Sequence, residues 1–376
     1  MDFDYVVMPA IILAIAILVI VVAVRRMRSL STQSYPKFRK VVDRIVLAIV
    51  IVLVAFLAGN CAYNAIAIQV FRASNPPMGS LYSVNGHNMQ LYCVGKGSPA
   101  IVLEPGLSAS SDALVMQEFQ SKLAGITRVC AYDRAGLGWS ESQPGPSDAD
   151  HIAANLHAVL AQSGEKGPYV FLVHSYGGIY ARDYTARYPD EVAGLILLDS
   201  ATPFQEQRSE LLRFSGPKLA ILRVAYMLGL PRLMGGCGRP FPGVEGRLGK
   251  AMGEDACLVH PEMFKEFQAM TQSSQETEHA GPFGSLPILI ISEDTSKLTS
   301  GPNPPKQMVE LAHLVDEMQE DLKRLSTRSR RIIATGSGHI IQRDREDLVV
   351  KETQVFVDQL RGVAPQPTSY GSTIAE

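Results

Sequence analysis

The chain begins with two long apolar stretches. Tyr5–Val24 and Ile45–Ile68 are 20 and 24 residues long and carry no charged side chain. Each exceeds the ~18 apolar residues that indicate a membrane-spanning helix. We therefore predict two transmembrane helices within a membrane anchor at residues 1–76. A pair of buried core helices is the alternative, although core helices of this length usually keep a polar face.

The segment between these stretches is strongly basic. Residues 25–44 contain seven basic residues and one acidic residue. Basic residues in a short loop mark the cytoplasmic side of a membrane. We therefore expect an integral membrane protein whose N-terminus, together with everything after about Asn64, lies on the extracytoplasmic side.

After residue 77, short apolar runs alternate with amphipathic stretches. Two alternating runs flank Asn85-Gly86 between Ser80 and Cys93, which is typical of a β-hairpin. Apolar runs that predict buried strands cover residues 100–103, 128–132, 169–173, 194–198, 287–291 and 331–334. Helical patterns cover residues 111–124, 148–162, 179–188, 305–325 and 345–360. This alternation predicts an α/β fold, a mostly parallel sheet with helices on both faces.

Residues 201–285 interrupt the alternation with helical pieces and with glycine and proline breaks. We interpret them as an inserted helical lid, so that residues 77–200 and 286–362 form the core and residues 363–376 a disordered tail. The most apolar part of the lid, Pro217–Met234, can face the membrane or the active site, and packing against the core is the interpretation we favour.

A serine stands at one of the predicted strand ends. The apolar run Tyr169–Val173 breaks before Ser175, Gly177-Gly178 follows, and a helical pattern begins at Ile179. A strand that turns sharply into a helix at a serine holds the hydroxyl at the carboxyl edge of a sheet, which is the geometry of a nucleophile elbow. We predict that Ser175 is a nucleophile that needs a base within hydrogen-bond reach.

A histidine and two carboxylates stand at other strand ends. Among eight histidines, His339 alone follows the last predicted strand, in a Gly-Ser-Gly-His loop. His174 adjoins Ser175, but adjacent strand residues point to opposite faces, so we expect it to pack or hydrogen-bond beneath the elbow. The carboxylate that orients the base is predicted to be Asp199, whose strand boundary is clear, with Asp294 as the alternative.

An oxyanion formed during acyl transfer needs preorganised N–H donors. The backbone N–H of Tyr176 follows the predicted nucleophile and is one candidate. The loop after the strand at residues 100–103 is the natural source of the other, and Gly106 in that loop permits a close approach. We therefore predict the N–H groups of Leu107 and Tyr176 as the oxyanion hole.

These segments resemble the α/β-hydrolase superfamily over about residues 79–362. The matching segments are Tyr-Asp-Arg-Ala-Gly-Leu-Gly-Trp-Ser at 132–140, His-Ser-Tyr-Gly-Gly at 174–178, Leu-Leu-Asp at 197–199 and Gly-Ser-Gly-His at 336–339. The resemblance implies a Ser-His-acid triad, a lid before the strand at 287–291, hydrolysis of esters, amides or related bonds, and no cofactor. Serine at position 175 argues against the epoxide-hydrolase and dehalogenase branches, which use a carboxylate nucleophile.

The chain departs from the family pattern at two positions. Val173 stands where the elbow usually has glycine, which relieves crowding in a strained turn. The oxyanion loop usually reads His-Gly, and here it reads Pro105-Gly106. In this loop, Gly106, the residue that permits a close approach, is retained.

Charge and cysteine content limit the classes of partner and the metal sites that we expect. Residues 1–76 contain eight basic and three acidic residues, and the remainder contains 27 basic and 34 acidic residues. An acidic catalytic portion argues against nucleic acid as a partner. The five cysteines fit no metal-ligand spacing, so we predict no metal site. Cys237 and Cys257 can pair if their stretch lies outside the cytoplasm, with free buried thiols as the alternative.

We thus expect a membrane-anchored serine hydrolase, a carboxylesterase or lipase whose substrate is a small-molecule or lipid ester. One alternative is a prolyl-type aminopeptidase or another amide hydrolase, in which acidic lid residues would hold a substrate amine; the candidates are Glu206, Glu210, Glu254 and Asp255. The other alternative is a non-catalytic binding protein that keeps the fold, for which Val173 is the one argument.

Overall fold

The computed structural model describes residues 7–108, 119–208, 216–237, 261–366 and 372–375, together with residues 212 and 239. The chain forms two compact units. The helical unit consists of Met1–Pro76 and Gly216–Pro261, and the sheet unit consists of Pro77–Ser215 and Glu262–Glu376.

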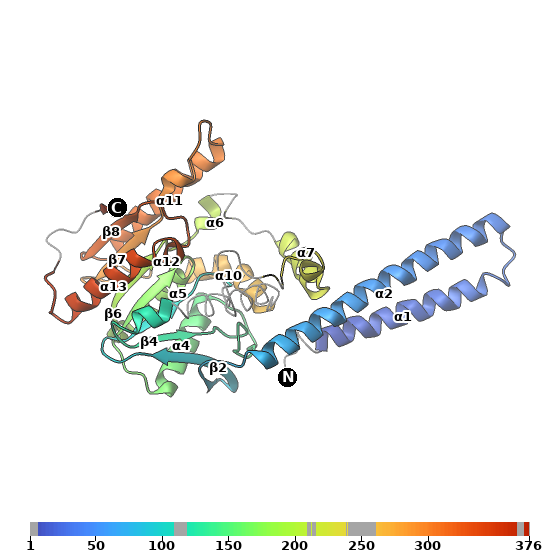
Figure 1. Cartoon of the computed structure of the whole chain (residues 1–376), viewed down its shortest axis with the longest axis horizontal. Helices are drawn as coiled ribbons and strands as arrows, with labels where there is room; N and C mark the ends of the chain where they lie inside the picture. Colours follow the sequence, from blue (N-terminus) through green and yellow to red (C-terminus); the bar gives the residue numbers. More distant parts are fainter. Residues whose placement is uncertain are drawn as a thin grey trace. The chain divides into compact units, whose positions relative to one another are not determined.

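The sheet unit is built around one twisted sheet (Figure 1). Its strands are β1 (Ser80–Val84), β2 (His87–Val94), β3 (Ile101–Glu104), β4 (Val129–Tyr132), β5 (Tyr169–His174), β6 (Val192–Leu198), β7 (Ile288–Ser292), β8 (Ser329–Ala334) and β9 (Ser372–Ala375). Over the described residues, the strand order is β1-β2-β4-β3-β5-β6-β7-β8-β9. β1, β2 and β4 pair antiparallel, and all other neighbours pair in parallel. The predicted hairpin and the predicted α/β class are both present.

Helices cover both faces of this sheet (Figure 1). α4 (Ala149–Ser163) and α5 (Gly177–Arg187) pack on one face, together with the end of α11 (Lys306–Leu322). α13 (Glu346–Leu360) and the helical residues 119–123 pack on the other face, with the short α12 (Ile341–Asp344) beside them.

β5 lies at the centre of the sheet and is buried along its whole length. Tyr169, Phe171 and Val173 contribute to the apolar cluster on the α4 and α5 face, whereas Val170 and Leu172 contribute to the cluster on the α13 face. A strand covered on both faces reads as a continuous apolar run. This burial holds the end of β5, and so the start of the elbow, in a fixed place.

The cysteines of the sheet unit form a disulfide that the sequence pattern did not predict. Cys93 of β2 and Cys130 of β4 stand opposite each other in the antiparallel register and are bonded. Cys237 is also disulfide-bonded, and Cys257, its predicted partner, lies outside the described residues. Cys61 is free and buried.

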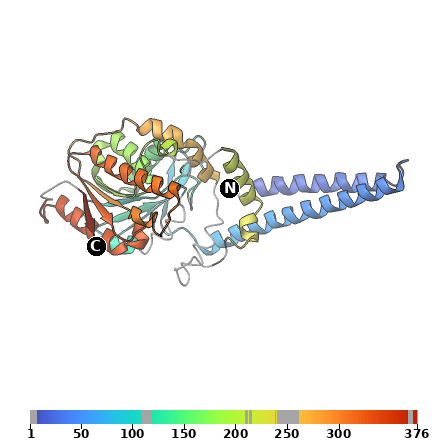
Figure 2. The same cartoon turned by 90° about the horizontal axis from the view of Figure 1, so that it is seen from above.

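The helical unit contains two long helices that run antiparallel, side by side (Figure 2). α1 (Met8–Ser29) and α2 (Lys37–Ser74) are both long and apolar enough to cross a membrane. They include most of the predicted spans 5–24 and 45–68. The connection between them is shorter than the predicted loop 25–44, because its basic residues continue both helices. α7 (Gly216–Met227) and α8 (Leu230–Leu233) complete the described part of this unit.

Two predicted segments differ from the structure. The predicted lid at 201–285 is divided: α6 (Gln205–Arg208) and nearly all of α10 (Pro261–Thr277) belong to the sheet unit, while α7 and α8 belong to the helical unit. The tail at 363–376 was predicted to be disordered, but β9 pairs in parallel with β8. Its β-branched Thr373 and Ile374 suit an edge position that β8 would otherwise leave open.

Candidate active site

Ser175 lies in a strained turn between β5 and α5. Its backbone φ is +54°, which is sparsely populated for a residue other than glycine and must be held by its surroundings. The glycines that follow permit the close packing that holds it. A Cβ at Gly177 would lie 2.6 Å from the Pro105 carbonyl oxygen, and a Cβ at Gly178 would lie 2.7 Å from Cβ of Ser200. The turn therefore presents the serine at the carboxyl edge of the sheet.

Val173, where the elbow usually has glycine, is accommodated in the core. Its side chain is fully buried. In the sheet it stands in register with Glu104 of β3 and Leu197 of β6. Because Ser175 adopts its positive φ with valine at position 173, this departure is compatible with the strained turn.

His339 connects Ser175 to Asp199. The histidine Nε2 lies 3.0 Å from Ser175 Oγ, and its Nδ1 lies 2.6 Å from Asp199 Oδ2. Asp199 is buried, and its Oδ1 accepts a hydrogen bond from the Glu293 backbone N–H at 3.2 Å. His174 lies next to this group, with its Nε2 2.9 Å from the His339 carbonyl oxygen. These contacts fix the imidazole between the serine and the acid.

Asp294, the alternative acid, is engaged elsewhere. Its Oδ1 accepts hydrogen bonds from the Ser296 hydroxyl at 2.6 Å and from the Ser296 backbone N–H at 3.2 Å. Its Oδ2 accepts one from the Gly336 backbone N–H at 2.9 Å. These bonds, that of the Ser296 hydroxyl first, lower the pKa of the Asp294 carboxyl. Asp294 therefore ties the loop that carries His339 to the end of β7, while Asp199 holds the ring.

Glu293 is a further buried carboxyl beside this group, and it is not among the site residues predicted from the sequence. It lines the same cavity as Asp199 and His339. Burial raises its pKa to about 7, and the negative charge of Asp199 acts in the same direction. The sequence could have indicated Glu293 as a site residue, because it is a carboxyl at the end of an apolar strand. Glu293 and Asp294 both follow β7, however, and the sequence pattern does not say which of them faces the site.

The oxyanion loop approaches the elbow closely. A Cβ at Gly106 would lie 3.2 Å from Cβ of Ser175 and 3.3 Å from Nδ1 of His174, so a larger residue would crowd Ser175. Leu107 and Tyr176 line the same cavity as Ser175. The structure thus places both predicted oxyanion residues beside the predicted nucleophile.

Arg134 binds this loop from inside the protein. Its guanidinium is almost fully buried, and Nη1 donates to Glu104 Oε1 at 2.9 Å and to the Pro105 carbonyl oxygen at 3.0 Å. Nη2 donates to the Gly106 carbonyl oxygen at 2.6 Å and to Glu266 Oε2 at 3.1 Å. Nε donates to Glu266 Oε1 at 2.7 Å. All five guanidinium donors therefore have partners, two of which are carbonyl groups of the oxyanion loop.

The same network reaches α10. Glu266 of that helix, besides binding Arg134, accepts a hydrogen bond from the Ser108 backbone N–H at 2.7 Å. The Ser108 hydroxyl donates to the Met263 carbonyl oxygen at 3.2 Å. The oxyanion loop is therefore hydrogen-bonded both to the interior of the sheet unit and to a helix of the predicted lid segment.

A cavity of about 490 Å³ opens beside Ser175 and His339. Most of its other walls are apolar, with contributions from α10 and α11. These lining residues include Leu107, Leu212, Phe267, Met270, Leu298, Leu311, Val315 and Met318. Polar side chains include Gln205 and Gln319. The volume is within the range of small-molecule sites.

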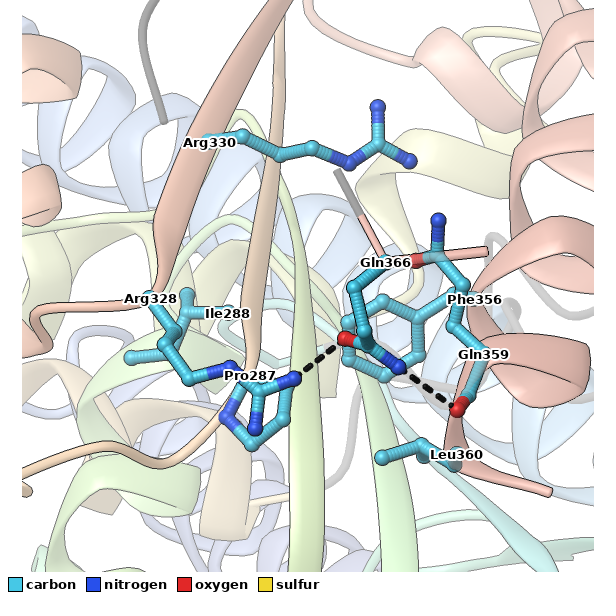
Figure 3. Close-up of a pocket in the computed structure, with 8 residues that line it drawn as sticks. All are labelled: Pro287, Ile288, Arg328, Arg330, Phe356, Gln359, Leu360 and Gln366. Carbon is cyan, nitrogen blue, oxygen red and sulfur yellow. Dashed lines mark hydrogen bonds between the residues drawn. The ribbon is translucent and has the colours of Figure 1, made fainter. Parts of the chain in front are cut away.

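Another cavity lies near the beginnings of β7 and β8, at the opposite end of these strands (Figure 3). Arg328 donates to the Gln366 side-chain oxygen there, and Gln366 Nε2 donates to the Gln359 carbonyl oxygen at 2.9 Å. Its volume of about 20 Å³ has room for about one water molecule. It is too small to hold an organic substrate.

Comparison with known proteins agrees with this architecture. A family model of the α/β-hydrolase fold matches residues 99–217. An uncharacterized protein of Bacillus subtilis is 32% identical over 127 residues, which are 34% of this chain and 39% of that protein. A bifunctional esterase/perhydrolase of Acinetobacter calcoaceticus is 35% identical over 108 residues, which are 29% of this chain and 38% of that protein. The matched part of this chain thus spans less than half the length of each relative.

A solved structure extends the likeness beyond the matched segment. The crystal structure of a lipase candidate from Acinetobacter baumannii superposes with a TM-score of 0.56 at 19% identity, covering 80% of this chain and 97% of that protein. At this identity the likeness concerns the fold. The sheet unit therefore has the α/β-hydrolase fold, and residues 99–217 match the family model of that fold.

Proposed function

We propose that the protein is a membrane-anchored serine hydrolase that cleaves a hydrophobic ester through an acyl-enzyme. The observation that carries this proposal is the hydrogen-bonded relay from Ser175 through His339 to Asp199, at 3.0 and 2.6 Å. A serine hydroxyl becomes an effective nucleophile when a base accepts its proton, and a histidine is held in the right orientation for this by a carboxylate on its other nitrogen.

The proposed reaction has two halves. Ser175 Oγ attacks the ester carbonyl while His339 Nε2 takes the hydroxyl proton, and Asp199 stabilises the imidazolium. The tetrahedral intermediate collapses, the ester C–O bond breaks, and His339 returns the proton to the departing alcohol. Water then attacks the acyl-enzyme with His339 again as base, and the acid product and free Ser175 are released.

The N–H groups of Leu107 and Tyr176 are the proposed oxyanion donors. In a trans peptide group the C=O and N–H bonds point in opposite directions. Arg134 holds the Gly106 carbonyl on the interior side, so the N–H of the same peptide group, that of Leu107, points away from Arg134. This orientation supports Leu107 as a donor to the oxyanion and gives Arg134 a positioning role.

The cavity supports a hydrophobic substrate. Its apolar walls would bury a hydrocarbon chain or ring at about 25 cal/mol per Å² of apolar surface. Gln205 and Gln319 are among the polar side chains that could orient the ester. A carboxylesterase or lipase activity on a small-molecule or lipid ester fits these walls better than hydrolysis of a charged substrate.

The helical unit and the disulfides support the proposed location. Basic residues at 25–44 favour a cytoplasmic connection between α1 and α2, which leaves the sheet unit outside. The Cys93–Cys130 disulfide and the disulfide of Cys237 support an oxidising compartment for that side. Protease access from outside intact cells tests this topology, and a protected sheet unit would reverse it.

The amide alternative receives less support. Glu206 is buried and is not among the described residues that line the cavity. Glu210, Glu254 and Asp255 lie outside the described residues. The non-catalytic alternative depended on Val173, and the elbow turn is formed with valine in place.

A matched substrate panel tests the proposed reaction. Purified full-length protein should hydrolyse aryl esters of medium-chain acids, and the corresponding anilides should react far more slowly. Ser175→Ala should lose the ester activity. Preferential hydrolysis of the anilides, or of aminoacyl anilides, would instead favour the aminopeptidase alternative.

A further inference from the structure

α7 and Met234, the residue that directly follows α8, expose large apolar side chains to the surroundings. Ile221 is 73% exposed, Val224 is 55% exposed and Met234 is 83% exposed. Ile221 and Val224 are three residues apart on α7 and therefore share one face of the helix. Large apolar side chains that are exposed on one helix face are a candidate site of interaction with a protein or a membrane.

The connection between α7 and α8 is attached to α2. Asn60 Nδ2 donates to the Leu228 carbonyl oxygen at 2.6 Å, and Arg232 Nε donates to Asn64 Oδ1 at 3.0 Å. Gly229 between them has a φ of +69°, and a Cβ there would lie 2.7 Å from Cβ of Asn64. The exposed apolar face is thus carried by a segment that packs directly on a candidate membrane span.

The position of this attachment across the membrane follows from the rise per residue along α2. The uncharged part of α2 begins after Arg44. At 1.5 Å per residue, Asn60 and Asn64 lie about 24 and 30 Å further along the axis. The hydrocarbon core of a bilayer is about 30 Å thick. With Arg44 at one boundary of the hydrocarbon, the attachment point of α7 and α8 lies close to the other boundary.

The charge of the segment suits a lipid surface. Residues 216–239 contain Lys218, Arg223, Arg232 and Arg239 and no acidic residue. Interfacial elements combine apolar side chains that enter the acyl region with Lys and Arg side chains that extend to the phosphates. Both features occur here within one short helical segment.

We propose that α7 and α8 form an interfacial element that inserts Ile221, Val224 and Met234 into the lipid leaflet next to Asn64. This inference rests on the proposed membrane anchoring and is independent of the proposed chemistry. Leu212, which lines the cavity, precedes α7 by only a few residues along the chain.

Tryptophan quenching in vesicles tests the insertion. Ile221→Trp is made in the full-length protein and reconstituted into phosphatidylcholine–phosphatidylglycerol vesicles, with the emission of Trp139 in the unsubstituted protein subtracted. Because an interfacial face lies ~5–10 Å deep, the added emission should fall about twofold when the acyl chains carry bromine. Met234→Trp should behave in the same way, which guards against misfolding at one position.

A matched control is available in the sheet unit. Val363 is 76% exposed, close to the value for Ile221. Val363→Trp should be quenched by aqueous iodide and not by brominated lipid. If both Ile221→Trp and Met234→Trp escape brominated lipid, the inference is overturned, and protection from iodide as well would indicate that a protein surface covers them. Failure of the protein to float with the vesicles would instead overturn the anchoring.

Discussion

Replacing Arg134 by lysine tests how the proposed oxyanion hole is held. The arginine uses five donors on two carboxylates and two carbonyl groups, including the Gly106 carbonyl at 2.6 Å. An ammonium group keeps the charge but has three donors. At least two of these hydrogen bonds must therefore be lost, and the planar fork that spans the loop and Glu266 cannot be reproduced.

The loss of kcat expected for Arg134→Lys has an upper bound. Loss of one oxyanion donor costs about 3 kcal/mol of transition-state stabilisation, or roughly 10²-fold in kcat. In Arg134→Lys the Leu107 N–H remains but is no longer fixed, so we expect kcat to fall about 10- to 100-fold. The hydrogen bond to the oxyanion forms in the transition state, so KM should stay within about twofold. Buried acceptors left without donors should also lower stability by about 1–3 kcal/mol each.

The assay separates positioning from general destabilisation. Initial rates on an aryl ester give kcat and KM, and chemical denaturation gives the free energy of unfolding. Arg331→Lys is the matched control, because Arg331 is equally buried and binds Ser292, Asp316 and Glu320, and none of its described hydrogen bonds reaches the oxyanion loop. The reasoning is refuted if Arg134→Lys keeps its kcat within twofold, or if Arg331→Lys loses kcat to the same extent.

Three further predictions concern the acids and the disulfide. Asp199→Asn should lower kcat by roughly 10⁴-fold, whereas Asp294→Asn should change kcat only a few-fold. Steady-state rates of the two variants, measured side by side, test this prediction. A larger loss of kcat in Asp294→Asn would make Asp294 the acid. The pKa of Glu293 is raised in the folded protein. Its contribution to the free energy of unfolding is therefore complete below about pH 4.5 and is lost as the pH rises through about 7. Glu293→Gln should therefore be more stable than the unsubstituted protein at pH 8 and no more stable at pH 4, as measured by thermal unfolding, and an equal effect at both pH values would contradict this assignment. The joint replacement of Cys93 and Cys130 by alanine removes a cross-link between positions 37 residues apart, so the free energy of unfolding should fall by about 4 kcal/mol; an unchanged denaturation midpoint would argue that the bond does not form.

The carboxyl ends of the strands could be located from the sequence alone. Parallel strands end at one edge of the sheet, so Ser175, Asp199 and His339 had to lie near one another once their strands were recognised. The choice between Asp199 and Asp294 could not be made in this way. Both follow apolar strands, and only the hydrogen bonds of the folded loop separate the residue that holds His339 from the one that holds Gly336.

Contacts between segments far apart in the chain could not be predicted from the sequence pattern. Arg134 and Glu266 are 132 residues apart, and nothing local indicates that they meet. Cys93 and Cys130 pair because β2 lies beside β4 in a particular register, which the pattern of each strand does not contain. The division of the predicted lid also depends on contacts, since α7 and α8 belong with the long helices because of what Asn60 and Asn64 bind.

The most direct test of the central claim is covalent labelling of Ser175. A fluorophosphonate should form a bond to its Oγ in the folded full-length protein, because His339 and the proposed oxyanion donors activate that oxygen and stabilise the adduct. Mass spectrometry should find the adduct on the peptide that contains Ser175, and Ser175→Ala should remain unlabelled. Labelling that persists in Ser175→Ala, or an adduct on another residue, would contradict the assignment of Ser175 as the nucleophile.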